Sequence, residues 1–254
     1  MDIVFNTLQV LFPRLINGLI LTIVSAVVCI ILAMILGVLA GFGRLSNVTV
    51  IRTISGFYVE TIRGTPLLFQ LSVWFFAIQV VLVTLFNVNV DGMVYNLLTA
   101  LNSNSLYPTG ASVSPLIFAI IGLSVNYGAY LAEVVRAGVQ TVEHGQTEAG
   151  LSLGLSRFQI ARHVVLPQAL RIMIPPLTNN FITLIQDTAF FQVLGVADLS
   201  LVIQTAAQAA PSSGPLRGSL YAVELILYFI ICYSLATLSR RMERRNAHTI
   251  AGAH

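Results

Sequence analysis

The stretch "LINGLILTIVSAVVCIILAMILGVLAGF", residues Leu15–Phe42, contains no charged side chain. An α-helix needs about 20 apolar residues to cross a bilayer, so this stretch is long enough to span one. Arg14 precedes it as a basic residue precedes the apolar core of a signal peptide, but the run is too long for such a core. We therefore expect it to be the first span of a helical membrane protein.

The rest of the chain repeats this pattern. The 254 residues are 56% hydrophobic and only 9% charged, with a mean hydropathy of +0.86, whereas soluble domains are about 25% charged. The sequence predicts an all-α membrane protein, a single transmembrane domain over residues 1–254 with five spans. The expected spans are residues 15–42, 66–90, 115–138, 172–194 and 220–238.

The basic residues exclude several chemistries. All 13 are arginines and lysine is absent, so the chain lacks the lysine of a nucleotide-binding P-loop or of a Schiff base. If ATP is used, another polypeptide must bind it. The histidines lie outside the apolar spans, which removes the usual partner of an intramembrane serine or zinc. We expect no catalytic residue, no metal and no cofactor in this chain.

The arginines also predict the topology. They gather between spans one and two, between spans three and four, and after span five, and cytoplasmic segments carry such an excess. The N-terminus is therefore expected outside and the C-terminus in the cytoplasm. The arginines that decide this are Arg44, Arg52, Arg63, Arg157, Arg162, Arg171, Arg240, Arg241, Arg244 and Arg245.

The long cytoplasmic segment, residues 140–171 and here called the insert, has a helical pattern of its own. We expect Glu148 near the start of a first helix, where its charge suits the helix dipole. Ser156 is the expected N-cap of a second helix, which Pro167 should end.

Small side chains mark one surface of the insert, at Ala149, Gly150 and Gly154. A bare helical surface allows another backbone to come close. The residues alone leave two alternatives open, a helix that docks into a partner's groove and a helix folded back on its own bundle.

The spacing within the insert resembles the EAA loop of ABC-transporter permease subunits. That motif reads Glu-Ala-Ala, three residues, Gly, nine residues, Ile, one residue, Leu-Pro. This chain keeps the spacing, with glycine in place of the second alanine and valine in place of isoleucine. The matching positions are Glu148, Ala149, Gly150, Gly154, Val164, Leu166 and Pro167.

The flanking segments resemble the polar amino-acid uptake branch of these permeases. They include "YVETIRGTPLLFQL" from Tyr58 and "YGAYLAEVVRAGVQ" from Tyr127. One departure is Gln186-Asp187-Thr188-Ala189, where that branch commonly has Lys-Asp-Thr-Ser. Asp187 therefore lacks its usual basic neighbour.

The resemblance implies the membrane-spanning subunit of a type I ABC importer for polar amino acids in a bacterial cytoplasmic (inner) membrane. The EAA loop would be a coupling helix that docks on an ATPase subunit, and that subunit would hold ATP and Mg²⁺. Further expected partners are membrane lipid, a second permease, either identical or different, and an extracytoplasmic amino-acid-binding protein contacting residues 91–114 and 206–218. No nucleic-acid partner is expected.

Polar residues within the spans are candidates for a substrate path. Charged groups in a membrane tend to face the bundle interior or water, and Asp187 is expected slightly past the midplane. The alternative is hydrogen bonding between helices. The candidates are Asp187, Thr188, Asn126, Tyr130, Glu133, Asn179 and Asn180. Asp187, Glu133 and Glu60 mildly favour a cationic group on the substrate.

A second set of residues is expected to have a gating or structural role. "ETIR" and "EVVR" each place Glu and Arg at i,i+3 on one helix face, which predicts the ion pairs Glu60–Arg63 and Glu133–Arg136. Prolines are expected to break or bend the chain, with Pro175 as the first residue of span four. The set is Glu60, Arg63, Gly64, Pro66, Arg136, Pro175 and Pro176.

One other function remains open from the sequence. Asp187 and Glu133 could carry protons in a proton-coupled secondary amino-acid transporter. That alternative predicts uptake without ATP, and it does not explain the motif spacing from Glu148 to Pro167.

Overall fold

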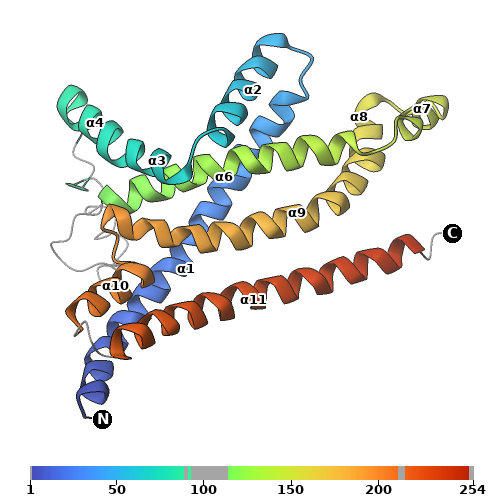
Figure 1. Ribbon diagram of the computed structural model, residues 1–254. Coiled ribbons are helices and arrows are strands. Elements are labelled where there is room, and N and C mark those ends of the chain that lie inside the picture. Colours follow the sequence, from blue (N-terminus) through green and yellow to red (C-terminus); the bar gives the residue numbers. More distant parts are fainter. Residues whose placement is uncertain (1, 89–90, 93–113, 211–214, 252–254) are drawn as a thin grey trace. The chain divides into compact units, whose positions relative to one another are not determined.

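The computed structural model describes residues 2–88, 91–92, 114–210 and 215–251, and most of these residues lie in helices joined by short connections (Figure 1). No strand occurs in this described part of the chain. The elements are α1 (Asp2–Arg44), α2 (Thr49–Arg63), α3 (Leu67–Ser72), the π-helical η1 (Val73–Ile78), α4 (Gln79–Phe86), α6 (Ser114–Gln140), α7 (His144–Ser152), α8 (Arg157–Ile160), the π-helical η2 (Ala161–Val165), α9 (Leu166–Asp187), the 3-10 helix η3 (Thr188–Leu194), α10 (Leu199–Ala209) and α11 (Pro215–Ala251).

Four segments are long and apolar enough to cross a membrane. They are Leu11–Arg44, Leu67–Phe86, Ser114–Gln140 and Pro215–Arg241. A bent pair, Arg157–Leu194 followed by Leu199–Ala209 at an angle of 52°, supplies a fifth if it forms one span. The predicted class, an all-helical membrane protein, is confirmed, and the described residues supply four or five of the expected spans.

Contacts between residues divide the chain into two compact units, and the long helices contribute to both. Each unit has its own packing and is described separately. The first unit comprises Met1–Ile31, Thr65–Ser124 and Leu184–Ile231, and the second comprises Leu32–Gly64, Val125–Thr183 and Cys232–His254.

The core of the first unit joins the N-terminal half of α1 to α10 and α11. Leu15 of α1 packs with Leu199 and Ile203 of α10 and with Leu220 of α11. A Cβ at Gly18 would lie 3.1 Å from the backbone of Asp198. The start of α10 therefore rests directly on the backbone of α1.

The second unit is held by close approach of α1 to α6. A Cβ built at Gly37 would lie 2.5 Å from the Cβ of Leu131, and one built at Gly41 would lie 2.7 Å from the Cβ of Val135. Such small-xxx-small spacing lets membrane helices pack closely where no hydrophobic driving force brings them together.

Helix α2 is fastened to α6 by a hydrogen bond and apolar contacts. The hydroxyl of Tyr58 donates to the carbonyl of Val125 at 2.6 Å. Burial raises the pKa of Tyr58 to about 12, so its proton stays in place. Val59 lies beside Ala129 and Ala132 of α6, which brings the end of α2 to the middle of α6.

The prolines of the fourth span do not start or break it. Pro175 and Pro176 lie inside α9, so the prediction that Pro175 begins the span is wrong. Proline's fixed φ fits a helix, and each ring removes one backbone donor. Packing of Met173 and Ala169 against Val135 of α6 accompanies the uninterrupted helix.

Candidate functional site

The insert forms two short helices joined by a tight turn, α7 and α8, which lie together at the junction of α6 and α9 (Figure 1). Glu148 lies in the second turn of α7, and the first turn has no acidic residue. The expected dipole interaction of Glu148 at a helix start is therefore wrong. Glu148 and Ala149 are exposed, whereas Gly150 is buried.

Gly154 ends α7 in a left-handed conformation, with φ of +76°. The amide of Leu155 donates to the carbonyl of Gly150 at 3.1 Å, and the amide of Gly154 donates to that of Leu151 at 2.9 Å. These two bonds form a Schellman motif, in which glycine is preferred because a Cβ is strained at this φ. Gly154 is thus required by the turn itself.

Gly150 has a different task. A Cβ at this position would lie 2.8 Å from the Cγ1 of Ile160, which is buried. The absence of a side chain lets α8 pack against α7. The motif's alanine is replaced by glycine here, and the buried Ile160 occupies the space that the alanine methyl group would need.

Ser156 caps α8 as predicted. Its hydroxyl accepts a hydrogen bond from the Gln159 amide at 3.3 Å, and the Gln159 side chain accepts one from the Ser156 amide at 2.8 Å. This reciprocal capping box satisfies two backbone donors that the helix start leaves open.

Pro167 does not end the helix. The amide of Leu166 donates to the carbonyl of Ala161, five residues back, so η2 is a wider π-helical turn just before the proline. Such a turn accommodates a proline ring within a continuous helix. The segment from Arg157 runs into α9, and the fourth span is continuous with the second half of the insert.

Large apolar side chains of the insert face solvent. Leu151 is 48% exposed, Leu153 is 80% exposed and Phe158 is 72% exposed. Of the other motif residues, Val164 is half-buried, and Leu166 and Pro167 are exposed. The insert helices therefore present apolar groups outward instead of burying them against the chain.

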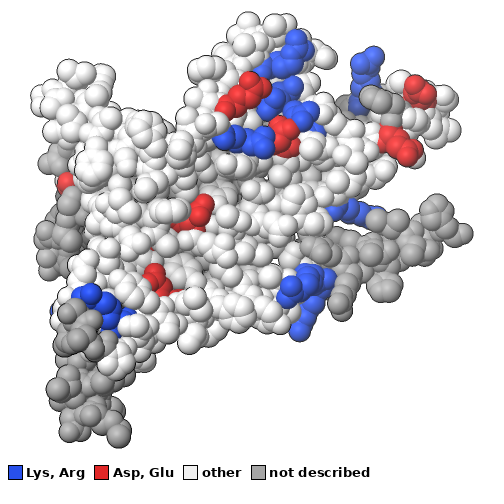
Figure 2. Space-filling view, viewed as in Figure 1, with Lys and Arg blue, Asp and Glu red and all other residues white. Residues whose placement is uncertain are grey.

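Charged residues of the second unit form a cluster, and Figure 2 shows red and blue side chains interleaved over α2. Arg44 bonds Glu133 at 3.0 Å and Glu60 at 3.3 Å. Arg136 pairs with Glu133, as predicted. The predicted pair Glu60–Arg63 is wrong, because Glu60 bonds Arg44 instead.

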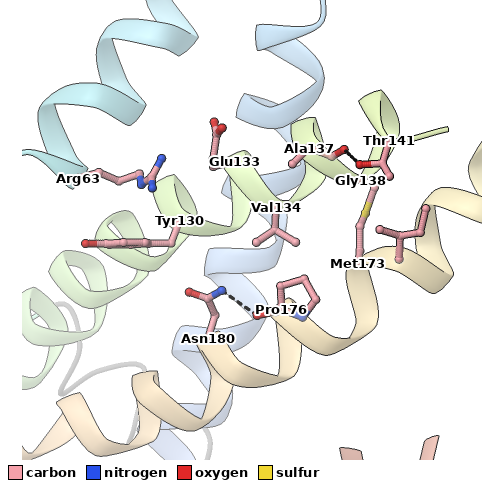
Figure 3. A pocket seen from close by; sticks show the side chains of 11 residues that line it. Arg63, Tyr130, Glu133, Val134, Ala137, Gly138, Thr141, Met173, Pro176 and Asn180 are labelled. Carbon is pink, nitrogen blue, oxygen red and sulfur yellow. Dashed lines mark hydrogen bonds between the residues drawn. The ribbon is translucent and has the colours of Figure 1, made fainter. Parts of the chain in front are cut away.

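A pocket of about 300 Å³ lies among α2, α6 and α9 of the second unit (Figure 3). Arg63 and Tyr130 line it, with the guanidinium carbon 5.3 Å from the ring centroid. Glu133 of α6 and Asn180 of α9 line it too. Three predicted path residues, Tyr130, Glu133 and Asn180, are thus brought to one pocket.

The other path candidates lie apart from this pocket's lining. Asn126 is buried within α6, and Asn179 is exposed on α9. Thr188 is fully buried in the first unit, where its hydroxyl donates to the carbonyl of Ile185 at 2.7 Å. Asp187, half-buried, is the last residue of α9. Two residues of the predicted gating or structural set, Gly64 and Pro66, lie in the connection between α2 and α3.

Sequence reasoning missed Asp198, which is 0% exposed. One carboxylate oxygen accepts a hydrogen bond from the Leu201 amide at 2.9 Å and so caps α10. The Leu199 amide donates to the hydroxyl of Thr22 at 3.1 Å. An aspartate directly before an apolar helical run was the signal that could have found this cap.

The spans and the capped helical insert define a multi-pass membrane protein, and comparison with known proteins gives its family. Residues 33–248 match the family described as binding-protein-dependent transport system inner membrane component. The chain belongs to this family, and the predicted resemblance to ABC permease subunits is confirmed. It is a multi-pass protein of the cytoplasmic (inner) membrane.

Two relatives match nearly the whole chain. The glutamine transport system permease protein GlnP of Escherichia coli (strain K12) is 33% identical over 92% of this chain and 93% of its own length. The L-cystine transport system permease protein TcyB of Bacillus subtilis (strain 168) is 33% identical over 93% of this chain and 88% of its own.

Solved structures agree on the fold. A chain of an amino acid ABC transporter crystallised with histidines has a TM-score of 0.71 and 27% identity, covering 92% of this chain and 94% of its own. The MetNI methionine ABC transporter, in an inward-facing conformation, has a TM-score of 0.60 at 21% identity and shows the fold alone.

Proposed function

We propose that this chain is the permease subunit of an ATP-driven importer for polar amino acids. Two relatives that match more than nine-tenths of the chain are named for glutamine and L-cystine transport, which supports the substrate class. Family membership favours this function over the proton-coupled alternative. The arginine distribution supports an N-terminus outside and a C-terminus in the cytoplasm.

The observation that carries the proposal is the outward-facing apolar surface of the insert. Leu153, the C-cap residue of α7, and Phe158 of α8 are mostly exposed, and the two helices pack on each other through Gly150 and Ile160. Exposed apolar side chains on rigid helices are typical of a helix that enters a partner's groove. The partner would be an ATPase subunit, which holds the ATP and Mg²⁺ that this lysine-free chain cannot bind through a P-loop.

The mechanism follows from the continuity of the fourth span. The helical segment from Arg157 enters α9 without a break, and α7 packs on it through Ile160. Movement of an ATPase pushing on Phe158 would therefore pass directly to α9. Because α9 carries Asn180 of the pocket, ATP binding and hydrolysis would change access to that pocket.

An extracytoplasmic binding protein and a second permease complete the proposed assembly. Most of the expected contact segment at residues 91–114, and part of the one at 206–218, lie outside the described residues. In this scheme the binding protein delivers the amino acid, closure of the ATPase pair opens the path outward, and hydrolysis returns it inward.

The test is uptake of radiolabelled L-glutamine and L-cystine into proteoliposomes containing the complex isolated through this chain, together with its binding protein. We expect uptake to require ATP on the side of the membrane where the ATPase subunits lie. Vanadate should abolish this uptake. Uptake driven by a pH gradient without ATP would overturn the proposal in favour of the proton-coupled transporter.

A further inference from the structure

The guanidinium of Arg63 lies over the ring of Tyr130 in the second unit. It forms no hydrogen bond or ion pair with any described residue, and its contact is the face of Tyr130 at 5.3 Å. An arginine presents five N–H donors in a fixed planar fork. The aromatic ring positions this fork, and Figure 3 shows it beside Tyr130 in the pocket.

The carboxylates nearby are already used. Glu133 bonds Arg44 through Oε2 at 3.0 Å and Arg136 through Oε1. Glu60 bonds Arg44 at 3.3 Å. Three guanidiniums, those of Arg44, Arg63 and Arg136, thus accompany two carboxylates, and the charge left without a partner is positive. Two of the three carboxylates that mildly favoured a cationic group on the substrate, Glu60 and Glu133, are therefore already paired with arginines.

The wall across the pocket supplies an acceptor and an apolar surface. The side-chain amide of Asn180 donates to the carbonyl of Pro176 at 2.8 Å, which leaves its Oδ1 as an acceptor. Val134 and Met173 line the same pocket. A cation, an amide oxygen and an apolar wall within about 300 Å³ complement a carboxylate, an ammonium group and a side chain.

We infer that Arg63 binds the α-carboxylate of the transported amino acid, with the α-ammonium group directed to Asn180 and the side chain against Val134 and Met173. This inference rests on the proposed import function. Guanidinium and carboxylate match in a bidentate, charge-assisted pair. A cationic side chain is disfavoured because it would add positive charge to a site that already has an excess.

The experiment measures ligand binding to the complex isolated through this chain, in nanodiscs and without the binding protein, which would add its own selectivity. Affinities are taken from the ligand-dependent rise in unfolding temperature, which responds to weak ligands. The probes are the amino acid that the complex imports and its decarboxylated amine. For L-glutamine the amine is 4-aminobutanamide, which lacks the carboxylate and nothing else.

We expect the amino acid to bind at least about 10-fold more tightly than its amine, as loss of a charged hydrogen-bond pair implies. Arg63→Gln should remove this preference while leaving the affinity for the amine unchanged. Arg63→Lys keeps the charge without the fork and should give an intermediate ratio. Arg52→Gln, an exposed arginine on the same helix, is the matched control and should leave the ratio unchanged.

Each contrary result has a separate meaning. A wild-type complex that binds amino acid and amine equally, or an Arg63→Gln variant that keeps the preference, would overturn the inference. A variant that loses affinity for both ligands alike would assign Arg63 a structural role and would overturn it too. Failure of the complex to import any amino acid would overturn the proposed function itself.

Discussion

Glycines have different structural roles in α1, at Gly37 and Gly41, and in the insert, at Gly154. Gly37 and Gly41 of α1 lie against α6, where an added Cβ would meet Leu131 and Val135. Gly154 of the insert has nothing within 4 Å of an added Cβ and is needed for its positive φ. Gly37 and Gly41 bring two helices of this chain together, whereas Gly154 turns the chain.

This difference changes how the insert is expected to meet a partner. A bare helix surface would let a foreign backbone come close, but Gly150 is already covered by Ile160. The outward surface is formed by Leu153 and Phe158. The insert therefore offers apolar side chains to fill a groove, instead of a flat face to be covered.

The largest expected effect separates the two kinds of glycine. Gly37→Leu should destabilise the chain by about 3 kcal/mol or more, because the added side chain forces α1 and α6 apart. Gly56→Leu is the matched control, since nothing lies within 4 Å of an added Cβ there. Thermal unfolding of the purified chain in detergent measures both. Equal unfolding temperatures for the two variants would contradict the close packing of α1 on α6.

Replacing the turn glycine should have a smaller and local effect. Gly154→Ala places a Cβ at φ of +76°, which costs about 1–2 kcal/mol. Hydrogen exchange of the Leu155 amide should accelerate, because it donates to Gly150 in the Schellman motif. Gly154→Asn, which tolerates this conformation better, should accelerate it less. Gly145→Ala in α7 is the control, and a similar acceleration there would remove the special role of the turn.

The contact between Gly150 and Ile160 predicts coupling between two substitutions. Gly150→Ala gains about 1 kcal/mol of helix propensity but crowds Ile160, so we expect a net loss of about 1 kcal/mol. In an Ile160→Ala background the same change should be neutral or stabilising. A double-mutant cycle on the unfolding temperature measures this coupling, and additive effects would show that α7 and α8 do not pack as described.

Loss of the exposed cap should have the smallest effect. Ser156→Ala removes one half of the capping box and should cost about 0.5–1 kcal/mol. Ser156→Asp keeps an acceptor and should restore most of it. The measurement is the exchange rate of the Gln159 amide, which donates a hydrogen bond to the Ser156 hydroxyl. An unchanged rate in Ser156→Ala would mean that the cap contributes nothing.

Much of this could be predicted because it depends on local composition. Long apolar runs predict membrane-spanning helices, since few other structures satisfy the backbone in lipid. The Ser156 cap follows from a serine three residues before glutamine. The spacing from Glu148 to Pro167 gave the family, which residues 33–248 confirm.

The rest depends on contacts between distant segments. Glu60 bonds Arg44 instead of Arg63 because α2 lies against α1, and i,i+3 spacing carries no information about that neighbour. Local helix propensity predicts a break in the helix at Pro175 and Pro176, but α9 continues through both residues. The burial of Asp198 depends on Gly18 of α1, which is far away in the sequence.

The central claim is that the insert docks on a separate ATPase through its exposed apolar side chains. The most direct test is affinity purification of the chain from its native membrane in mild detergent, with the variant Leu153→Asp/Phe158→Asp beside it. Gln146→Asp, at an exposed position on α7, is the control, because it adds a negative charge to the insert without removing an apolar side chain. We expect a P-loop ATPase to accompany the wild type and the control and to be lost from the double variant. An ATPase retained by the double variant, or absent from the wild type after cross-linking, would contradict the claim.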